Sequence, residues 1–479
     1  MYAPKASSPP PPAPERVTGD APRDAAIAAI ARHAGKFPNL DLAPFDPPGL
    51  EGRDAAFAHA IVDAVLRRWL TLRHVIQTRL TQPFETVEHP LQAALLVGAA
   101  QVLLLDRVPA YAAIDHAVEW SKRRVRRGAG GMTNAVLRRV AGLAGAGGPG
   151  DAPRPAYADE PTHLPLPDGS ALVLAEPVFD GDPLERLARA TGHPRALLDV
   201  WSKAHGERAA RDLALHGIMH PPTIVRLPAA GVPADADPTH FTPHRVPGFA
   251  VFTGSHAALR AFLETHPDAW VQDPASTLAI ESVADLKPRV IVDACAGQGT
   301  KTRQLARTFP DARIIASDTD DARRKVLASV FQGHPRVSVW RPERLIDHAG
   351  KADLVLLDVP CSNTGVLARR PEAKYRFRPA AIEELEGIQR QILADAIPLL
   401  SDDGFSGAGG RGGGGLILYS TCSLQPAENA GHIAWAKQWH SFAASRQRQS
   451  LPTGGPGRPA TEYADGSYSV VLGRWALRG

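Results

Sequence analysis

The first third of the chain has apolar residues at intervals of three and four positions, the spacing that gathers them on one face of a helix. The spacing is clearest over residues 53–70, 91–105 and 110–125. Pro90 and Pro109 stand where the last two of these helices would begin, and proline is tolerated in the first turn of a helix. The pattern predicts an all-helical domain over residues 23–145.

From about residue 285 the pattern changes to short apolar runs with helical stretches between them. The runs are residues 289–295, 312–318, 336–340, 352–360 and 415–422. Strands that alternate with helices are typical of an open, mostly parallel α/β sheet. Ligands of such sheets bind beyond the carboxyl ends of the strands, so we expect the functional residues in the loops that follow these runs.

Three other segments complete the predicted organisation. Residues 1–22 are rich in proline and are predicted to be a disordered tail, whereas residues 146–182 are rich in Gly, Pro and Asp and are predicted to be a linker. Residues 183–284 combine helical stretches with short β-like runs. They are expected to form the N-terminal part of a module whose catalytic domain covers residues 285–479.

Composition and charge limit the class of protein. A formal net charge of +4 is too small to indicate a nucleic-acid partner, which would need a local basic cluster. Three cysteines are too few for a disulfide framework and lack the spacing of metal ligands, so no metal site is predicted. The N-terminus has prolines where a secretion signal has its apolar core, and residues 91–105 are too short to span a bilayer. We expect a soluble, cytoplasmic protein.

A glycine-containing loop, in the segment DACAGQGTKT, follows the first predicted strand. Glycine lets backbone N–H groups approach a cofactor closely. The loop lacks the third glycine of a dinucleotide fingerprint and the glycine before lysine of a Walker A motif, which favours a nucleoside without phosphates. Asp318 ends the second strand, where its carboxylate could accept hydrogen bonds from ribose hydroxyls or cap the next helix.

All three cysteines stand in loops that follow predicted strands. Cys295 lies in the glycine-containing loop, Cys361 in the segment DVPCSNTG, and Cys422 in YSTCS, which Glu428 and Asn429 follow. A single cysteine is more often a small buried apolar residue. The Ser and Thr residues around the last two instead favour a thiolate nucleophile with a second thiol beside it.

These segments resemble the motifs of the RNA cytosine-5 methyltransferases of the Sun/Fmu (RsmB-type 16S rRNA) family. DACAGQGTKT resembles the first motif of that family, DVPCSNTG the motif of the nucleophile's partner, and YSTCS followed by EN the nucleophile motif. The segment VQDPAST, residues 271–277, resembles the entry segment of the fold of that family. Residues 106–122 and 130–140 resemble the NusB-like RNA-binding domain of the bacterial enzyme. The resemblance implies an all-α NusB-like domain followed by an α/β, Rossmann-like class I methyltransferase domain.

The resemblance also implies an activity and the residues that carry it. S-adenosylmethionine would methylate C5 of a cytosine in RNA, with 16S rRNA as the first candidate, after a thiolate adds to C6. Cys422 would be the nucleophile, Cys361 would assist elimination and release, Asp358 would bind the cytosine ring, and Lys301 would support the loop. The implied cofactor-binding residues are Cys295, Ala296, Gly297, Gln298, Gly299, Thr300, Lys301, Asp318, Glu343 and Asp358.

Basic residues form two candidate RNA contacts. The first set, in the NusB-like segment, is Lys122, Arg123, Arg124, Arg126 and Arg127; the second, after Cys361, is Arg369, Arg370 and Lys374, with Arg376 nearby. A run of charges is more often a solvated helix face, and only its place in an RNA-binding domain favours phosphate contacts.

Several alternatives stay open at this point. The family's first motif usually reads AAPGG, which this chain lacks, and no acid directly follows its third strand, where Glu343 is the nearest. These departures favour a non-catalytic RNA-binding or ribosome assembly factor, which the paired cysteines disfavour. The substrate could be tRNA or another RNA. The cysteine roles could be exchanged, since DNA cytosine-5 methyltransferases place their nucleophile in a Pro-Cys motif. We expect a monomer.

Overall fold

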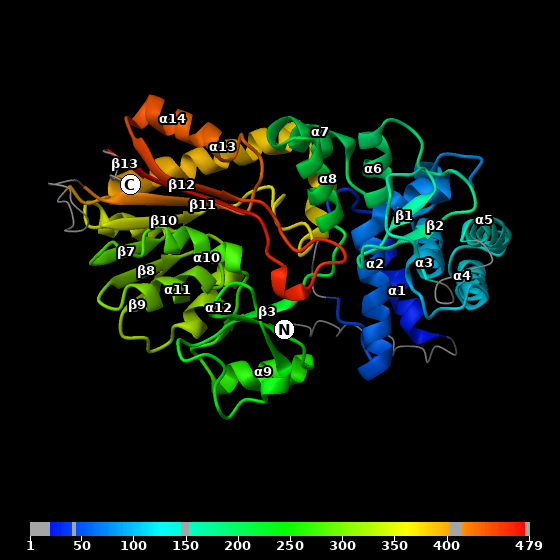
Figure 1. Cartoon of the computed structure of the whole chain (residues 1–479), viewed down its shortest axis with the longest axis horizontal. Helices are drawn as coiled ribbons and strands as arrows, with labels where there is room; N and C mark the ends of the chain where they lie inside the picture. Colours follow the sequence, from blue (N-terminus) through cyan, green and yellow to red (C-terminus); the bar gives the residue numbers. More distant parts are fainter. Residues whose placement is uncertain (1–19, 41–44, 145–152, 403–413, 475–479) are drawn as a thin grey trace, which may run out of the picture. The chain divides into compact units, whose positions relative to one another are not determined.

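The computed structural model describes residues 20–40, 45–144, 153–402 and 414–474 (Figure 1). The chain divides into two compact units, an N-terminal unit of residues 1–37 and 41–151 and a C-terminal unit of residues 38–40 and 152–479. Most of the segment predicted to be a disordered tail, residues 1–19, lies outside the described residues. None of the described helices combines the length and the apolar character that crossing a membrane requires.

The N-terminal unit is helical in its described part. Its elements are α1 (Ala21–Ala34), α2 (Gly52–Gln77), the 3-10 helix η1 (Phe84–Thr86), α3 (His89–Leu104), α4 (Ala110–Arg124) and α5 (Ala129–Leu143). Helix α3 is buried around its whole circumference and packs against the four other α-helices, as a central helix must. A side chain at Gly98 would overlap Leu137 of α5, so glycine permits the two helices to approach.

A seven-stranded sheet is the centre of the C-terminal unit. Its strands are β7 (Val290–Asp293), β8 (Arg313–Ser317), β9 (Val337–Trp340), β10 (Leu354–Asp358), β11 (Leu416–Thr421), β12 (Ala443–Ser450) and β13 (Ser467–Gly473). They lie in the order β12-β13-β11-β10-β7-β8-β9. Strands β7 to β11 are parallel to one another. Strand β13 pairs antiparallel with both of its neighbours, β11 and β12. The strand order reverses between β7 and β10, which is where open α/β sheets bind ligands.

Helices cover both faces of this sheet (Figure 1). Alternate residues such as Ile291 and Leu356 pack with α10 (Pro274–Glu281), α11 (Thr300–Thr308) and α12 (Asp321–Val330). Their neighbours, such as Val292 and Leu357, pack with α13 (Pro379–Ala396) and α14 (Ala430–His440). Because both faces are buried, each central strand reads as a continuous apolar run. The predicted all-α and Rossmann-like α/β fold class is confirmed.

Smaller elements precede the large sheet. They are β1 (His163–Pro165), β2 (Ala171–Val173), α6 (Pro183–Thr191), α7 (Arg195–His205), α8 (Glu207–His216), β3 (Thr223–Arg226), η2 (Pro238–His240), β4 (Phe241–Pro243), β5 (Phe249–Phe252), α9 (His256–Thr265) and β6 (Trp270–Val271). Strands β4-β5-β3-β6 form a second sheet. Further 3-10 helices are η3 (Pro342–His348), η4 (Pro371–Arg376), η5 (Ile397–Leu399) and η6 (Ala460–Glu462).

The stretch expected to be a linker contains packed structure. Strands β1 and β2 pair antiparallel between residues 163 and 173. Leu164, Leu172 and Phe179 are buried there. In the described part of this stretch, Pro167, Asp168 and Gly169 lie in the turn between the two strands, and the buried apolar side chains hold the hairpin in place.

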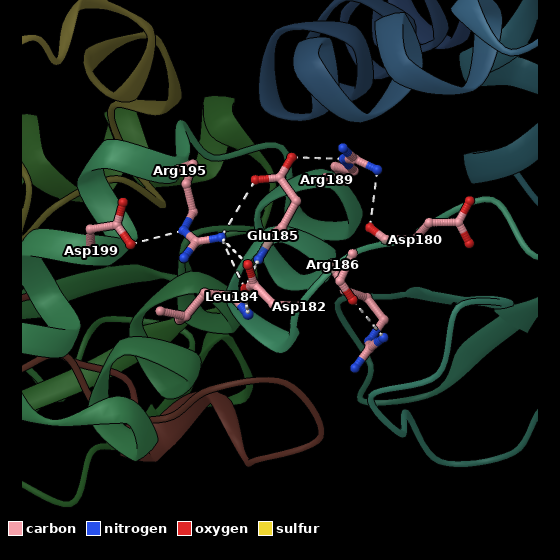
Figure 2. Close-up of polar contacts among 9 residues, drawn as sticks. Asp180, Asp182, Leu184, Glu185, Arg186, Arg189, Arg195 and Asp199 are labelled. Atoms are coloured by element: carbon pink, nitrogen blue, oxygen red, sulfur yellow. Dashed lines mark hydrogen bonds and ion pairs between the residues drawn. The ribbon is translucent and has the colours of Figure 1, made fainter.

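An ion-pair network joins α6 to α7 (Figure 2). The Arg195 guanidinium pairs with Asp182, at 2.8 Å, and with Asp199, also at 2.8 Å. Asp182 also caps α6, because its carboxylate accepts two N–H groups of the first turn. Exposed ion pairs add little stability individually. The apolar side of these helices packs against Leu367 and Leu424, which follow Cys361 and Cys422, so apolar contacts join α6 and α7 to both cysteine loops.

Candidate active site

Three neighbouring parallel strands end at one edge of the large sheet. Strand β7 ends at Asp293, β10 at Asp358 and β11 at Thr421. Asp293 stands opposite Leu356, and Asp358 stands opposite Ser420, so β10 extends two residues past the end of β7 and β11 one residue past the end of β10. The loops that follow carry the three cysteines, and the structure therefore brings the sequence-predicted motifs together.

The loop after β7 is shaped by two glycines in the left-handed region. Gly297 has φ +58° and Gly299 has φ +95°, conformations that side chains disfavour. At Gly299 a side chain would also overlap Phe331 and Leu327. Apart from its chain neighbours, no atom of the described residues lies within 4 Å of the position that a Gly297 side chain would take, so the backbone there faces open space.

Asp318 holds this loop in place. Its Oδ2 accepts the Gly297 N–H at 2.8 Å, and its Oδ1 accepts the Asp320 N–H at 2.9 Å. The cap of α12 is Asp320, whose side chain accepts the Arg323 N–H. Of the two interpretations of Asp318, the structure excludes the helix cap, and it adds a role as a brace for the loop.

Two acids and a lysine lie at the strand ends beside the loop that follows β7. Lys301 Nζ donates to Asp358 Oδ2 at 2.8 Å. Burial alone would lower the pKa of Lys301, but the Asp358 carboxylate outweighs it and raises that pKa, with Cys422 adding to the effect. Asp293 is fully buried, and its Oδ2 accepts the Thr302 hydroxyl at 2.7 Å. Its Oδ1 has no hydrogen-bond partner among the described residues, and burial raises the pKa of Asp293 to about 7.

The sulfurs of Cys361 and Cys422 lie 3.3 Å apart. The Cys422 thiol also donates to Asn363 Oδ1 at 3.2 Å, while Asn363 Nδ2 donates to the Cys361 carbonyl at 2.9 Å. Asn363 has φ +58°, a strained conformation that turns its amide toward both cysteines. The contact with Cys422, together with burial, raises the pKa of Cys361, which therefore carries its proton. Cys422 is the more exposed of the two.

Of the remaining predicted cofactor-binding residues, all but Glu343 lie in the loop or at the start of α11. Gln298 and Thr300 are exposed, Ala296 is buried, and Glu343 lies exposed in η3. Burial raises the pKa of Cys295, which keeps this thiol neutral.

Two predicted RNA contacts need correction. Arg369 donates to Asp465 at 2.6 Å and to Asp273 at 3.1 Å, so its guanidinium is committed inside the protein. Lys374 is fully buried, and its Nζ lies over the ring of Tyr375. A buried cation cannot reach RNA phosphates. Arg370 is exposed, as are the basic residues of the N-terminal unit, which are Lys122, Arg123, Arg124, Arg126 and Arg127.

Asn363, Asp293 and Glu428 stand in or directly after the sequence motifs, but no role was predicted for any of them. Their positions beside the cysteines and at the end of β7 were visible in the sequence. The positive φ of Asn363 and the burial of the two acids were not.

Comparison with known proteins gives two family matches. The 16S rRNA methyltransferase RsmB/F family matches residues 283–455, and the NusB family matches residues 21–142. Both matches agree with the resemblance stated from the motifs.

Individual relatives extend over most of the chain. Ribosomal RNA small subunit methyltransferase B of Erwinia tasmaniensis is 28% identical over 88% of this chain and 90% of its own length. The Mycobacterium tuberculosis protein Rv1407 is 30% identical over 83% of this chain and 81% of its own length. The crystal structure of PH0851 shares the fold, with a TM-score of 0.67 and 19% identity over 94% of this chain and 98% of that one.

Proposed function

The chain belongs to the RsmB/F family of 16S rRNA methyltransferases, and on this premise we propose that it methylates C5 of a cytosine in RNA, with 16S rRNA as substrate and S-adenosylmethionine as methyl donor. The observation that carries the proposal is the pair of thiols, 3.3 Å apart, at the ends of two adjacent parallel strands. Lys301 and Asp358 lie at the same edge.

The loop after β7 fits a ligand such as the methyl donor on two observations. Within the part of the chain that the structure describes, the backbone at Gly297 faces open space, and one oxygen of the buried Asp293 has no hydrogen-bond partner. Residues 295–301 with Asp318 would hold the donor, and Glu343 and Asp358 would lie beside it. When bound, S-adenosylmethionine supplies an electrophilic methyl group.

The protein would supply nucleophilic catalysis. Cytosine C5 is too weak a nucleophile to take a methyl group unaided, and a thiolate that adds to C6 makes C5 electron-rich. Cys422 suits this role because this residue is the more exposed of the two. After methyl transfer a base takes the C5 proton, the electron pair of that C–H bond re-forms the ring double bond, and the Cys422 sulfur leaves C6 as a thiolate.

Cys361 suits the release step. Its raised pKa keeps the proton on its sulfur, 3.3 Å from the sulfur of Cys422. A protonated thiol there can donate a hydrogen bond to the departing thiolate. The Lys301 ammonium favours negative charge at the same edge, and Asp358 holds that ammonium in place.

RNA would also contact the N-terminal unit. Its exposed basic cluster offers charges to phosphates, although Lys122 and Arg126 each pair with a glutamate at 2.7 Å in the free protein. Such surface pairs are weak enough for phosphates to replace them.

The test separates the two thiols by role, with rRNA incubated with each variant and run on a denaturing gel. Cys422→Ala is expected to abolish both methyl transfer and the covalent protein–RNA adduct. Cys361→Ala is expected to methylate without release, which leaves a slowly migrating adduct. The reverse pattern would assign the nucleophile to Cys361. Wild-type protein that binds rRNA but transfers no methyl group would indicate a non-catalytic assembly factor, and modification confined to tRNA would change the substrate.

A further inference from the structure

The buried carboxylate of Glu428 accepts hydrogen bonds from both cysteine loops. Glu428 is fully buried, and its Oε1 accepts the Ser362 N–H at 2.8 Å. Its Oε2 accepts the hydroxyls of Ser362 and Ser423. Ser362 directly follows Cys361, and Ser423 directly follows Cys422. Each loop is therefore attached to the same carboxylate at the residue next to its cysteine.

Rigid elements fix Glu428 itself. Gln389 of α13 donates from one Nε2 to Glu428 Oε1 at 3.0 Å and to the Pro360 carbonyl at 2.8 Å. His432 of α14 donates from Nε2 to Gln389 Oε1 at 2.6 Å, and burial lowers the pKa of His432 to about 4, so the ring is neutral. The Tyr419 hydroxyl of β11 donates to the Glu428 carbonyl at 2.8 Å. Gln389 thus fixes the carboxylate, His432 fixes Gln389, and Tyr419 fixes the backbone of Glu428.

The hydrogen bonds to Glu428 depend on the position of each donor, which apolar packing contacts do not. Burying a carboxylate is costly unless its oxygens are hydrogen-bonded, and here donors from both loops satisfy them. If either loop moved away, Glu428 would lose a donor, and the buried charge would be left partly unpaired. The network therefore resists separation of Ser362 from Ser423, and with them the two cysteines.

We propose that Glu428 is a positioning residue that sets the separation of the Cys361 and Cys422 sulfurs through Ser362 and Ser423. Its effect on methyl transfer rests on the proposed function, whereas its effect on the thiol geometry does not. Glu428 contacts neither RNA nor the methyl donor in this role, because it is fully buried beneath both loops.

The rate of disulfide formation depends on the thiol separation and on the thiolate fraction. Glu428→Ala and Glu428→Gln remove the same charge, so the difference between their rates reports on the separation. A disulfide needs sulfurs about 2.05 Å apart, so thiols at 3.3 Å require only a small shift. With diamide as oxidant, the two thiols lose two protons and two electrons, which reduce its N=N bond to a hydrazine. Peptide mass spectrometry identifies the Cys361–Cys422 link and separates it from any link to Cys295.

Glu428→Ala is expected to slow this cross-link at least ten-fold, and Glu428→Gln to restore it to within a few-fold of wild type. The glutamine amide keeps the size of the side chain, and the two serine hydroxyls can turn to accept its N–H groups. In steady-state kinetics with rRNA, Glu428→Ala should lower kcat and leave KM unchanged. Ser423→Ala, which removes one contact only, should slow the cross-link several-fold.

Phe262→Ala is the matched control for lost stability. Phe262 is buried in the core of the second sheet, in a cluster that contains no residue of the cysteine loops. This variant should unfold at a lower temperature and cross-link at the wild-type rate. The proposal is overturned if Glu428→Ala or Ser423→Ala cross-links like wild type, or if Phe262→Ala slows the reaction equally. Wild-type protein that fails to methylate RNA would refute the proposed function and leave these rates interpretable.

Discussion

Asp293 should make the large sheet less stable as the pH rises toward neutrality, and Asp293→Asn should remove that dependence. The carboxyl group is fully buried at the end of β7, where one oxygen accepts the Thr302 hydroxyl and the other has no partner in the described ranges of the chain. Burial raises its pKa to about 7, the negative charges of Asp358 and Asp318 act in the same direction, and Thr302 and Lys301 oppose them.

The sign and size of the effect follow from proton linkage. An aspartate in the unfolded chain has a pKa near 3.9. Between about pH 4 and pH 7 the folded protein therefore holds a proton on Asp293 that the unfolded chain has lost, so the free energy of unfolding falls as the pH rises through this window. At about 1.4 kcal/mol per pH unit, three units give roughly 4 kcal/mol as an upper limit. Partial relaxation of the site reduces this to about 2–4 kcal/mol.

Asparagine matches the protonated acid in shape and stays neutral. Asp293→Asn should therefore equal the wild type in stability near pH 4 and exceed it by about 2 kcal/mol or more at pH 8. Hydrogen exchange of peptides from β7 and β8, compared at each pH, reports on this sheet alone. The comparison also cancels other titrations, such as that of Asp273, whose pKa burial raises to about 6. Parallel stability profiles for the two proteins would refute the reasoning.

Two further predictions test the proposed ligands. Asp318→Ala should weaken S-adenosylmethionine binding by about 1–3 kcal/mol, because the Gly297 and Asp320 N–H groups lose their acceptor; unchanged affinity in calorimetry would count against the assigned site. Reversing four basic residues to Glu should weaken rRNA binding and flatten its salt dependence, because fewer counterions are released; binding that ignores the change would make the cluster a solvated helix face. The four are Lys122, Arg123, Arg124 and Arg126.

The parallel strands could be predicted because burial on both faces leaves an unbroken apolar run in the sequence. Strand β12 could not be. Its sequence, AASRQRQS, has no apolar run, and most of it is at least partly exposed. Pairing with β13 holds it at the edge of the sheet, with a register shift between Ser445 and Arg448. Backbone pairing of this kind leaves no mark on the side-chain pattern.

The chemistry at the strand ends was predictable for a related reason. A residue that ends a parallel strand is placed by local sequence, so Cys361 and Cys422 could be assigned to one edge before the structure was known. Their separation could not, since it depends on Asn363, whose strained backbone no pattern announces, and on Glu428, which lies 66 residues from Ser362.

Arg369 is a residue whose role was predicted wrongly because its partners are distant in the sequence. A cation beside the Cys361 loop was predicted to bind RNA, yet its partners, Asp273 and Asp465, each lie 96 residues away in the chain. The pairing holds the segment after Asp465 against that loop, where the Gly466 N–H donates to the Gly365 carbonyl at 2.7 Å. In turn the Gly365 N–H donates to the Cys422 carbonyl at 2.8 Å. A partly buried charge whose partners are distant in sequence thus supports the cysteine loops, and charge alone could not distinguish this role from phosphate binding.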